Sequence, residues 1–265
     1  MPKFTSNQRA RHQEALSILK YRVRDFEAIY EFFEKFDEAF YADISKDNAY
    51  FTPVGLARDI SIAVGGRRVL DVAAGIGVLS CLEWHMNGKQ SDVVCIEQNP
   101  KFVEIGRKIF PEAHWICGDM MNPSIYEPLG TFDTAVSNPP FGSNKSAFKA
   151  PRYKGASLPY HIIDLLSDIA DEGVFILPDR LVSDEFRGGY VGLYDQRHYT
   201  SFVEQTHIKL GRTSIDAGYY CKEWKHTKID VHLVTSDFRE TRRLRDLGKT
   251  YELFGQSKPQ KRLVG

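Results

Sequence analysis

The 265-residue sequence has no excess of charge of either sign and no long apolar run, and each absence excludes a class of protein. Its 35 basic and 35 acidic residues balance, so a uniformly basic nucleic-acid-binding protein is excluded and any contact with phosphate must be local. No run of about 20 apolar residues could cross a membrane, and the first residues lack the apolar core of a secretion signal. We expect a cytoplasmic protein with no membrane partner.

Cysteine is also scarce. The four cysteines, Cys81, Cys95, Cys117 and Cys221, are scattered without the spacing of metal ligands, and three fall in or beside expected strands. Buried, reduced thiols are therefore expected, and we predict no metal site. The length suits one large α/β domain with a sizeable core and an extension, and leaves little room for a second full domain.

A loop of small residues follows the apolar segment 68–72, which is typical of a strand that leads into a helix. The loop contains Ala73, Gly75 and Gly77. In a doubly wound α/β fold this turn lies at the carboxyl edge of the sheet, where cofactors bind and small residues let the backbone approach a ligand. The dinucleotide fingerprint requires a third glycine where this chain has Ser80, so nicotinamide binding is disfavoured.

Acidic residues accompany three successive apolar segments. Asp71 precedes the glycines, Glu97 closes the second segment with Gln98 after it, and Asp119 follows the third with Met120 after it. A carboxylate at the end of the second strand commonly binds ribose hydroxyls, and Asp119 is suited to an adenine amino group. Each acid alone could be a helix N-cap, but three in register favour ligand binding.

The fourth apolar segment, 132–137, ends in Asn138, Pro139, Pro140 and Phe141. A residue before proline is confined to extended geometry, so Asn138 is held in one direction, and its side-chain oxygen can accept a hydrogen bond from an exocyclic amine. The Pro139 carbonyl can accept a second bond, and Phe141 can stack on the ring that bears the amine. The alternative is a plain turn after a strand.

This order of motifs resembles the class I S-adenosylmethionine-dependent methyltransferases, and Asn-Pro-Pro-Phe resembles their amino-methylating members. The upstream residues Tyr50, Phe51, Thr52 and Pro53 are similar to the Phe-Thr-Pro element of the gamma-type DNA adenine methyltransferases, in which it contacts the methionine end of the cofactor. The same residues suit a helix start, with Thr52 as N-cap. Ala73 stands where many relatives carry glycine, which we expect to cost little because alanine is nearly as small.

The resemblance implies a doubly wound, Rossmann-like, seven-stranded methyltransferase sheet that binds S-adenosylmethionine. It implies methyl transfer to the N6 amino group of adenine in nucleic acid, DNA being favoured, after the base is flipped out of the helix. The stretch 132–142 also looks like that of ribosomal RNA adenine methyltransferases. Methylation of the guanine amino group in ribosomal RNA, methylation of a protein glutamine, where tyrosine usually replaces Phe141, and a binding protein without activity stay open.

The chain divides into an N-terminal helical extension (1–48), the methyltransferase core (49–236) and a basic C-terminal tail (237–265). Apolar residues recur on one helix face between Ser6 and Ala42, and we expect this face to pack on the core, a homodimer arm being the alternative. Beyond the Asn-Pro-Pro-Phe motif we expect a strand at 173–177, a helix at 183–196, and an antiparallel hairpin of 217–223 with 228–235.

Two groups of basic residues are candidate contacts with a nucleic acid. The first lies after Phe141, where Phe148 and Tyr153 are interleaved with cations and carboxylates are lacking, and it suits a loop that binds phosphates and stacks a base; its members are Lys145, Lys149, Arg152 and Lys154. The second lies in the tail, where a solvated helix is an equal alternative; its members are Arg239, Arg242, Arg243, Arg245, Lys249, Lys258, Lys261 and Arg262.

Overall fold

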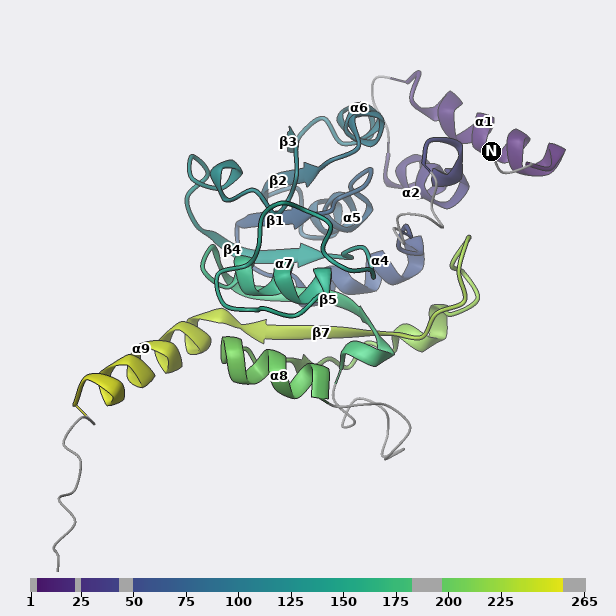
Figure 1. Ribbon diagram of the computed structural model, residues 1–265. Coiled ribbons are helices and arrows are strands. Elements are labelled where there is room, and N and C mark those ends of the chain that lie inside the picture. Colours follow the sequence, from purple (N-terminus) through teal and green to yellow (C-terminus); the bar gives the residue numbers. More distant parts are fainter. Residues whose placement is uncertain (1–3, 22–24, 43–49, 183–196, 255–265) are drawn as a thin grey trace, which may run out of the picture.

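The computed structural model describes residues 4–21, 25–42, 50–182 and 197–254, and its centre is one seven-stranded sheet (Figure 1). The strand order is β3-β2-β1-β4-β5-β7-β6, with β7 antiparallel to both of its neighbours and the other pairs parallel. The strands are β1 (Arg68–Val72), β2 (Asp92–Glu97), β3 (His114–Cys117), β4 (Phe132–Ser137), β5 (Ala170–Pro178), β6 (Gly211–Arg212) and β7 (Val231–Asp237). The predicted doubly wound, seven-stranded fold is confirmed.

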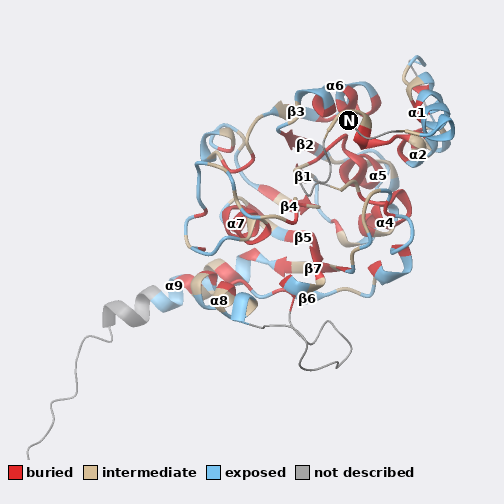
Figure 2. Ribbon diagram, turned by 45° about the vertical axis from the view of Figure 1, so that its right-hand side comes forward, coloured by how far each residue is buried: buried red, intermediate tan, exposed pale blue. Residues whose placement is uncertain are grey.

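Successive side chains of the strands pack alternately into two separate hydrophobic cores, one on each face of the sheet. Val69 and Val93 belong to the first core, whereas the next residues along the same strands, Leu70 and Val94, belong to the second. Helices α4 (Val54–Ile60), α5 (Val78–Met86) and α6 (Pro100–Ile109) cover the first face, and α7 (Leu158–Leu166), α8 (Arg197–Thr206) and α9 (Phe238–Phe254) flank the second. Figure 2 shows the buried strands between these layers.

The order of the strands reverses at β1, whose neighbours are β2 on one side and β4 on the other. Ser137, the last residue of β4, donates its hydroxyl proton to the carbonyl of Val72, the last residue of β1, at 2.5 Å. The glycine loop after β1 and the Asn-Pro-Pro-Phe motif after β4 therefore leave the sheet side by side. Ligands of open α/β sheets bind at such a switch point.

The N-terminal extension contains two helices where we expected one continuous helical stretch. They are α1 (Ser6–Ile18) and α2 (Phe26–Lys35), and they pack against each other. The side chain of Asp25 accepts a hydrogen bond from the backbone N–H of Ala28 and so starts a new helix. Helix α2 also contacts α4 and α5, so the extension rests on the core as predicted. A dimer arm stays an untested alternative.

The predicted hairpin is partly wrong. Its second segment forms β7, but Ala217–Tyr220 is a 3-10 helix, capped by the side chain of Asp216, and the partner of β7 at the sheet edge is the two-residue strand β6. The predicted helix at 183–196 lies outside the described residues. The remaining 3-10 turns are Glu38–Phe40, Ser61–Ala63, Pro123–Ile125 and Asp179–Leu181. Within the described segments, none of the helices is both long and apolar enough to span a bilayer.

Candidate active site

The glycine loop is shaped by residues with left-handed backbone geometry. Gly75 and Gly77 have φ of 58° and 85°, and Ala73 has φ of 59°. A Cβ at Gly75 would lie 2.8 Å from the ring of Phe51, so only glycine fits beneath that ring. Our expectation that alanine at position 73 costs little requires correction: its small size is suitable, but a left-handed φ costs an alanine about 1–2 kcal/mol.

Two of the predicted acids support this loop. The Glu97 carboxylate accepts hydrogen bonds from the backbone N–H groups of Gly75, at 2.9 Å, and Asn99, at 2.8 Å. Burial raises the pKa of Glu97, although these backbone hydrogen bonds oppose the shift. Glu97 therefore ties the end of β2 to the glycine loop, and its predicted contact with a ribose stays a prediction.

Asp71 is fully buried beneath the loop and does not line the cavity described below. Its Oδ2 accepts hydrogen bonds from the hydroxyl of Ser80, at 2.7 Å, and from the Ser80 backbone N–H, at 3.3 Å, while Oδ1 has no partner. Burial raises its pKa to about 7, and the bonds from Ser80 oppose the rise. In this structure Asp71 positions the start of α5, which corrects the expectation of a direct contact with the cofactor.

Asp119 lies at the other end of the site. Its carboxylate accepts hydrogen bonds from the backbone N–H of Met121, at 2.9 Å, and from the hydroxyl of Ser146, at 2.6 Å. Ser146 belongs to the basic loop after Phe141, so this contact joins the predicted cofactor acid to the predicted substrate loop.

Asn138 is held by the Phe-Thr-Pro element, as the two motifs are in direct contact. Its Nδ2 donates hydrogen bonds to the backbone carbonyl of Tyr50, at 2.8 Å, and to the hydroxyl of Thr52, at 3.0 Å. These two acceptors fix which way the amide faces. Its Oδ1 is buried, and no group in the described part of the chain donates a hydrogen bond to it. A buried acceptor without a partner costs free energy, and an incoming N–H donor would remove that cost.

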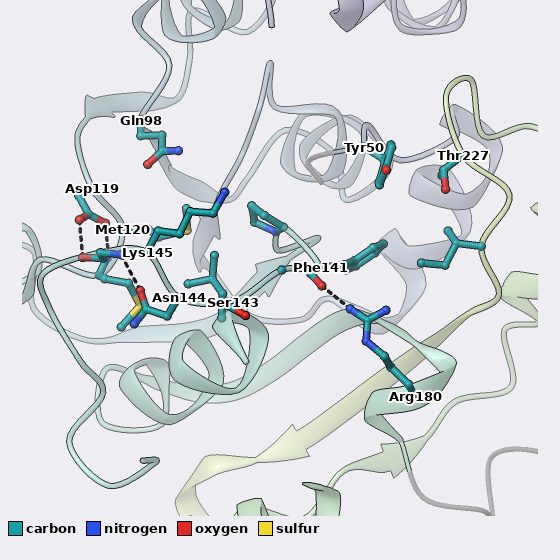
Figure 3. Close-up of a pocket in the computed structure, with 16 residues that line it drawn as sticks. Tyr50, Gln98, Asp119, Met120, Phe141, Ser143, Asn144, Lys145, Arg180 and Thr227 are labelled. Atoms are coloured by element: carbon teal, nitrogen blue, oxygen red, sulfur yellow. Dashed lines mark hydrogen bonds between the residues drawn. The ribbon is translucent and has the colours of Figure 1, made fainter. Parts of the chain in front are cut away.

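A cavity of about 690 Å³ lies beside these groups (Figure 3). Segments that are far apart in the sequence supply its walls. Several predicted residues line it, namely Tyr50, Gln98, Asp119, Met120, Pro140, Phe141 and Lys145. Phe141 is only 4% exposed, and its ring centre lies 6.5 Å from that of Tyr50, so it forms a firm wall.

The sequence did not lead us to Arg180, Thr227 and Ile229, which also line this cavity. Arg180 follows β5 in the turn Asp179–Leu181, and its guanidinium donates a hydrogen bond to the carbonyl of Phe141. Its position just after a parallel strand is the signal that would have found it. Thr227 and Ile229 come from the segment before β7, which carries no motif.

Of the predicted phosphate contacts in the basic loop, Lys145 lines the cavity and Lys149 is exposed. Lys154 is exposed too, and its ammonium donates to the carbonyl of Pro151. Phe148 is 39% exposed, whereas Tyr153 is buried. The ring of Tyr153 packs in the second core and also lines a second cavity, so its base-stacking role stays a prediction.

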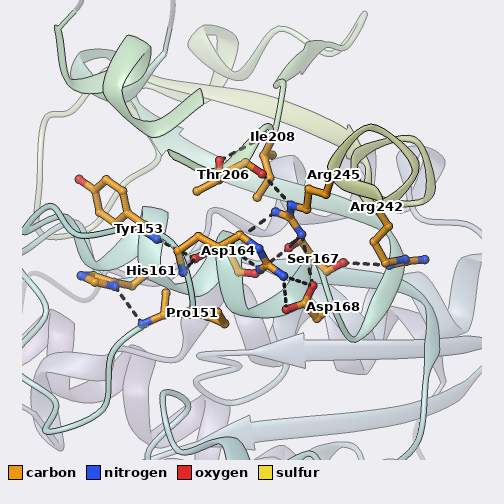
Figure 4. A network of polar contacts seen from close by, with 12 residues as sticks. Pro151, Tyr153, His161, Asp164, Ser167, Asp168, Thr206, Ile208, Arg242 and Arg245 are labelled. Atoms are coloured by element: carbon orange, nitrogen blue, oxygen red, sulfur yellow. Dashed lines mark hydrogen bonds and ion pairs between the residues drawn. The ribbon is translucent and has the colours of Figure 1, made fainter. Parts of the chain in front are cut away.

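Arg152 pairs with carboxylates of the chain itself, which corrects our expectation of a phosphate contact. The carboxylates belong to a polar network around Asp164, Asp168 and Arg245 (Figure 4). The Arg152 guanidinium pairs with Asp164, at 3.0 Å, and with Asp168, at 2.8 Å. Arg245 of α9 joins the same network from the other side, 3.2 Å from Asp168. Asp164 is fully buried, so the network fixes the basic loop and α9 to α7.

The described arginines of the tail are paired as well. Arg239 bonds to Glu172, Arg242 to Asp171 and Arg243 to Glu240, and Arg245 is buried. Four of the eight residues of the predicted basic patch are thus engaged within the chain. Of the other members, the side chain of Lys249 and all of Lys258, Lys261 and Arg262 lie outside the described part of the chain.

A charged cluster joins the N-terminal extension to the segment before β7. Asp37, Glu38 and His226 bring possible metal ligands within 4.8 Å of one another, a grouping that we did not predict because His226 is distant in sequence. The charge of Lys225 also acts on both carboxylates, so we interpret the group as an ion cluster. Glu38 is only 1% exposed, and its Oε1 accepts the backbone N–H of Phe51 at 3.2 Å.

Known proteins resemble this chain at low sequence identity. No curated protein matches the chain by sequence. Three solved structures resemble it at low identity: the 23S rRNA methyltransferase ErmE (14% identity, covering 71% of this chain and 68% of that chain, TM-score 0.48), the Pyrococcus abyssi tRNA (uracil-54, C5)-methyltransferase (14%, 71% and 40%, 0.44), and the T. thermophilus 16S rRNA N2 G1207 methyltransferase (16%, 71% and 43%, 0.42).

Residues 56–151 match the family model described as the methyltransferase small domain. The matched segment begins in α4 and includes the glycine loop, all three acids and the Asn-Pro-Pro-Phe motif. Over this segment the chain is similar to that methyltransferase family, and its seven-stranded sheet is the doubly wound sheet that the resemblance to class I S-adenosylmethionine-dependent methyltransferases implies.

Proposed function

We propose that this enzyme methylates the N6 amino group of adenine in nucleic acid, with an unstacked adenine of structured RNA preferred over duplex DNA. The observation that carries the proposal is the buried Oδ1 of Asn138, which has no partner while both of its amide protons are engaged. An exocyclic amine offers the N–H donor that this oxygen lacks.

The residues around the glycine loop fit the cofactor. Gly75 and Gly77 leave the backbone open to a ligand, Gln98 and Asp119 offer polar groups along the cavity, and Phe51 covers the loop. When bound, S-adenosylmethionine supplies a methyl group on a positively charged sulfur. The protein's own contribution is to hold the acceptor amine in line with that methyl group and to exclude water.

Asn138 would act on the electronic structure of the amine. The lone pair of the adenine amino group is delocalised into the ring, which makes the nitrogen a poor nucleophile. A hydrogen bond from the amine to Asn138 Oδ1, with a second to the Pro139 carbonyl as predicted, favours a pyramidal nitrogen whose lone pair points away from these acceptors. Phe141 would support the base, which is consistent with its place in the cavity wall.

The pairing of the arginines favours RNA over our initial preference for DNA. Binding to a duplex depends on many phosphate contacts. Arg152, Arg242 and Arg245 are bound to carboxylates of the chain itself, which leaves fewer cations for a duplex backbone. An unpaired adenine in an RNA loop is already unstacked, so it requires neither those contacts nor the cost of base flipping.

The polymer is tested by incubating the enzyme with labelled S-adenosylmethionine and matched structured RNA, single-stranded DNA and duplex DNA. The digested nucleosides are then identified by mass spectrometry. We expect N6-methyladenosine, mostly from the RNA. Methylation of duplex DNA alone would overturn the preference for RNA, and labelled glutamine in added protein with no labelled nucleoside would overturn the proposal.

A further inference from the structure

Arg180 stands between two adjoining cavities. The second cavity, of about 380 Å³, shares Phe141, Gly142, Ser143 and Arg180 with the first. In Figure 3, Lys145 and Arg180 lie on opposite sides of Phe141. The residues that line both cavities thus include the aromatic residue of the proposed catalytic motif and an arginine.

The backbone on both sides of Arg180 is anchored. The preceding Asp179 pairs with His232 of β7, at 2.9 Å. The following Leu181 is buried, and its carbonyl accepts the hydroxyl proton of Tyr160 at 2.8 Å. Arg180 therefore extends from a fixed base, and the loss of conformational freedom on binding a ligand is small.

The guanidinium of Arg180 has hydrogen-bond donors that are not used within the described part of the chain. A guanidinium carries five N–H groups, and within the described part of the chain Arg180 donates to a single acceptor, the carbonyl of Phe141. Its side chain is exposed, unlike that of Arg245 in the network of Figure 4. The remaining donors are free for an anion, and a guanidinium suits phosphate because two of its N–H groups can bind two oxygens together.

The surroundings also favour an anion. The described residues that line the second cavity include no carboxylate, and His198, Ser143 and Ser157 are among them. The carboxylate of the first cavity, Asp119, already accepts hydrogen bonds on both oxygens. Lys145 adds a second cation on the far side of Phe141.

We propose that Arg180 binds the phosphodiester that links the target nucleotide to its neighbour, and that the second cavity holds the neighbouring nucleoside. This inference rests on the proposed function and deepens it, because it makes the substrate a chain of at least two nucleotides. A free nucleoside or a protein amide has no group to place at Arg180.

The test measures binding and needs no turnover. The probe is a uridine-rich single-stranded oligoribonucleotide with one central adenosine, bound in the presence of S-adenosylhomocysteine. Two further probes each carry one uncharged methylphosphonate linkage, on the 5′ or the 3′ side of the adenosine. For the wild type we expect one of the two substitutions to weaken binding about tenfold, the size of a lost charge-assisted hydrogen bond.

Arg180→Gln should bind the fully charged probe about as weakly as the wild type binds the methylphosphonate probe that weakens its binding. The variant should bind these two probes with equal affinity. For this variant, the slope of the logarithm of the association constant against the logarithm of the salt concentration should be smaller in magnitude by about 0.7. This change corresponds to one lost phosphate contact on a single strand. Arg180→Lys should restore part of the difference. Arg212→Gln, which removes an exposed cation on β6, should behave as the wild type.

If Arg180→Gln discriminates between the charged and neutral probes as strongly as the wild type does, Arg180 only holds the Phe141 carbonyl and the inference is wrong. An absence of oligonucleotide binding by the wild type would also overturn it. The probes could bind to the wild type and to Arg180→Gln as expected and yet never be methylated. That result would contradict the proposed reaction alone, so the two failures are distinguishable.

Discussion

At the scale of single residues, the polar groups of this site are held in strained or unsatisfied states. Ala73 has a left-handed φ, Asn138 Oδ1 is buried without a donor, and Asp71 carries a second unpartnered oxygen. Strained and unsatisfied groups of this kind cluster at functional sites. These positions surround the ends of β1 and β4, where the cofactor and the amine would meet.

Asp71 gives a prediction about stability. Its pKa in the folded protein is about 7, above its ordinary value of 3.8, so its contribution to stability is fully present below pH 3.8 and is lost as the pH rises towards 7. Asp71→Asn stays neutral and should therefore be more stable than the wild type at pH 8, by about 1 kcal/mol or more. Urea unfolding at pH 8 and pH 5 checks this. The gain should shrink at pH 5, and an equal gain at both values would contradict the assignment.

At the scale of elements, the Phe-Thr-Pro segment holds the Asn-Pro-Pro-Phe motif in place through the Asn138 amide. Thr52→Val keeps the shape of the side chain but removes one of the two acceptors of the Asn138 amide. We expect kcat to fall about tenfold, the value of one hydrogen bond. Thr52→Ser keeps the hydroxyl and should retain most of the activity. If steady-state kinetics gave the same kcat for Thr52→Val and the wild type, the hydrogen bond from Asn138 to Thr52 would have no part in the reaction.

The N-terminal helices should dock in a pH-dependent manner. The hydrogen bond from His226 to Asp37, at 2.7 Å, raises the pKa of His226 above its ordinary value of 6.5, and Glu38 and Lys225 are the other charges that act on it. The stabilisation is therefore complete below pH 6.5 and is lost as the pH rises through the raised pKa. Hydrogen exchange of α1 and α2 should quicken between pH 6 and pH 9.

His226→Gln serves as the control for this prediction. Its exchange in α1 and α2, corrected for the intrinsic effect of pH, should change much less than that of the wild type over the same range. The variant also separates the effect of His226 from that of Asp71, because ionisation of Asp71 destabilises both proteins equally as the pH rises. Parallel pH profiles for the two proteins would show that His226 has no part in docking.

At the scale of the whole molecule, a zero net charge conceals an ordered pairing of arginines with carboxylates. Arg245→Met should destabilise the fold by about 1–3 kcal/mol, because buried Asp164 loses one of its two cations and keeps Arg152. Arg243→Met, in an exposed pair on the same helix, is the matched control and should have no measurable effect. Urea unfolding measures both. Equal stability of the two variants would mean that the network of Figure 4 contributes little.

The same pairing explains what the sequence could and could not predict. The strands and the strand-end motifs were predictable, because apolar runs and small-residue loops are local patterns. The partner of β7 was not, since β6 has two residues and no apolar pattern. Arg152 and Arg245 both pair with Asp164, and these pairs depend on segments that meet only in the folded chain. A cluster of cations in the sequence therefore overstated the basic surface.

The most direct test of the account compares turnover with cofactor affinity in Asn138→Ala. If the Oδ1 of Asn138 accepts the amine only during reaction, kcat should fall by about 10²-fold or more, while the dissociation constant of S-adenosylmethionine, measured by calorimetry, should stay within a few-fold of the wild type. Equal losses of turnover and cofactor affinity, or full activity, would contradict the assignment of Asn138 as the acceptor of the target amine.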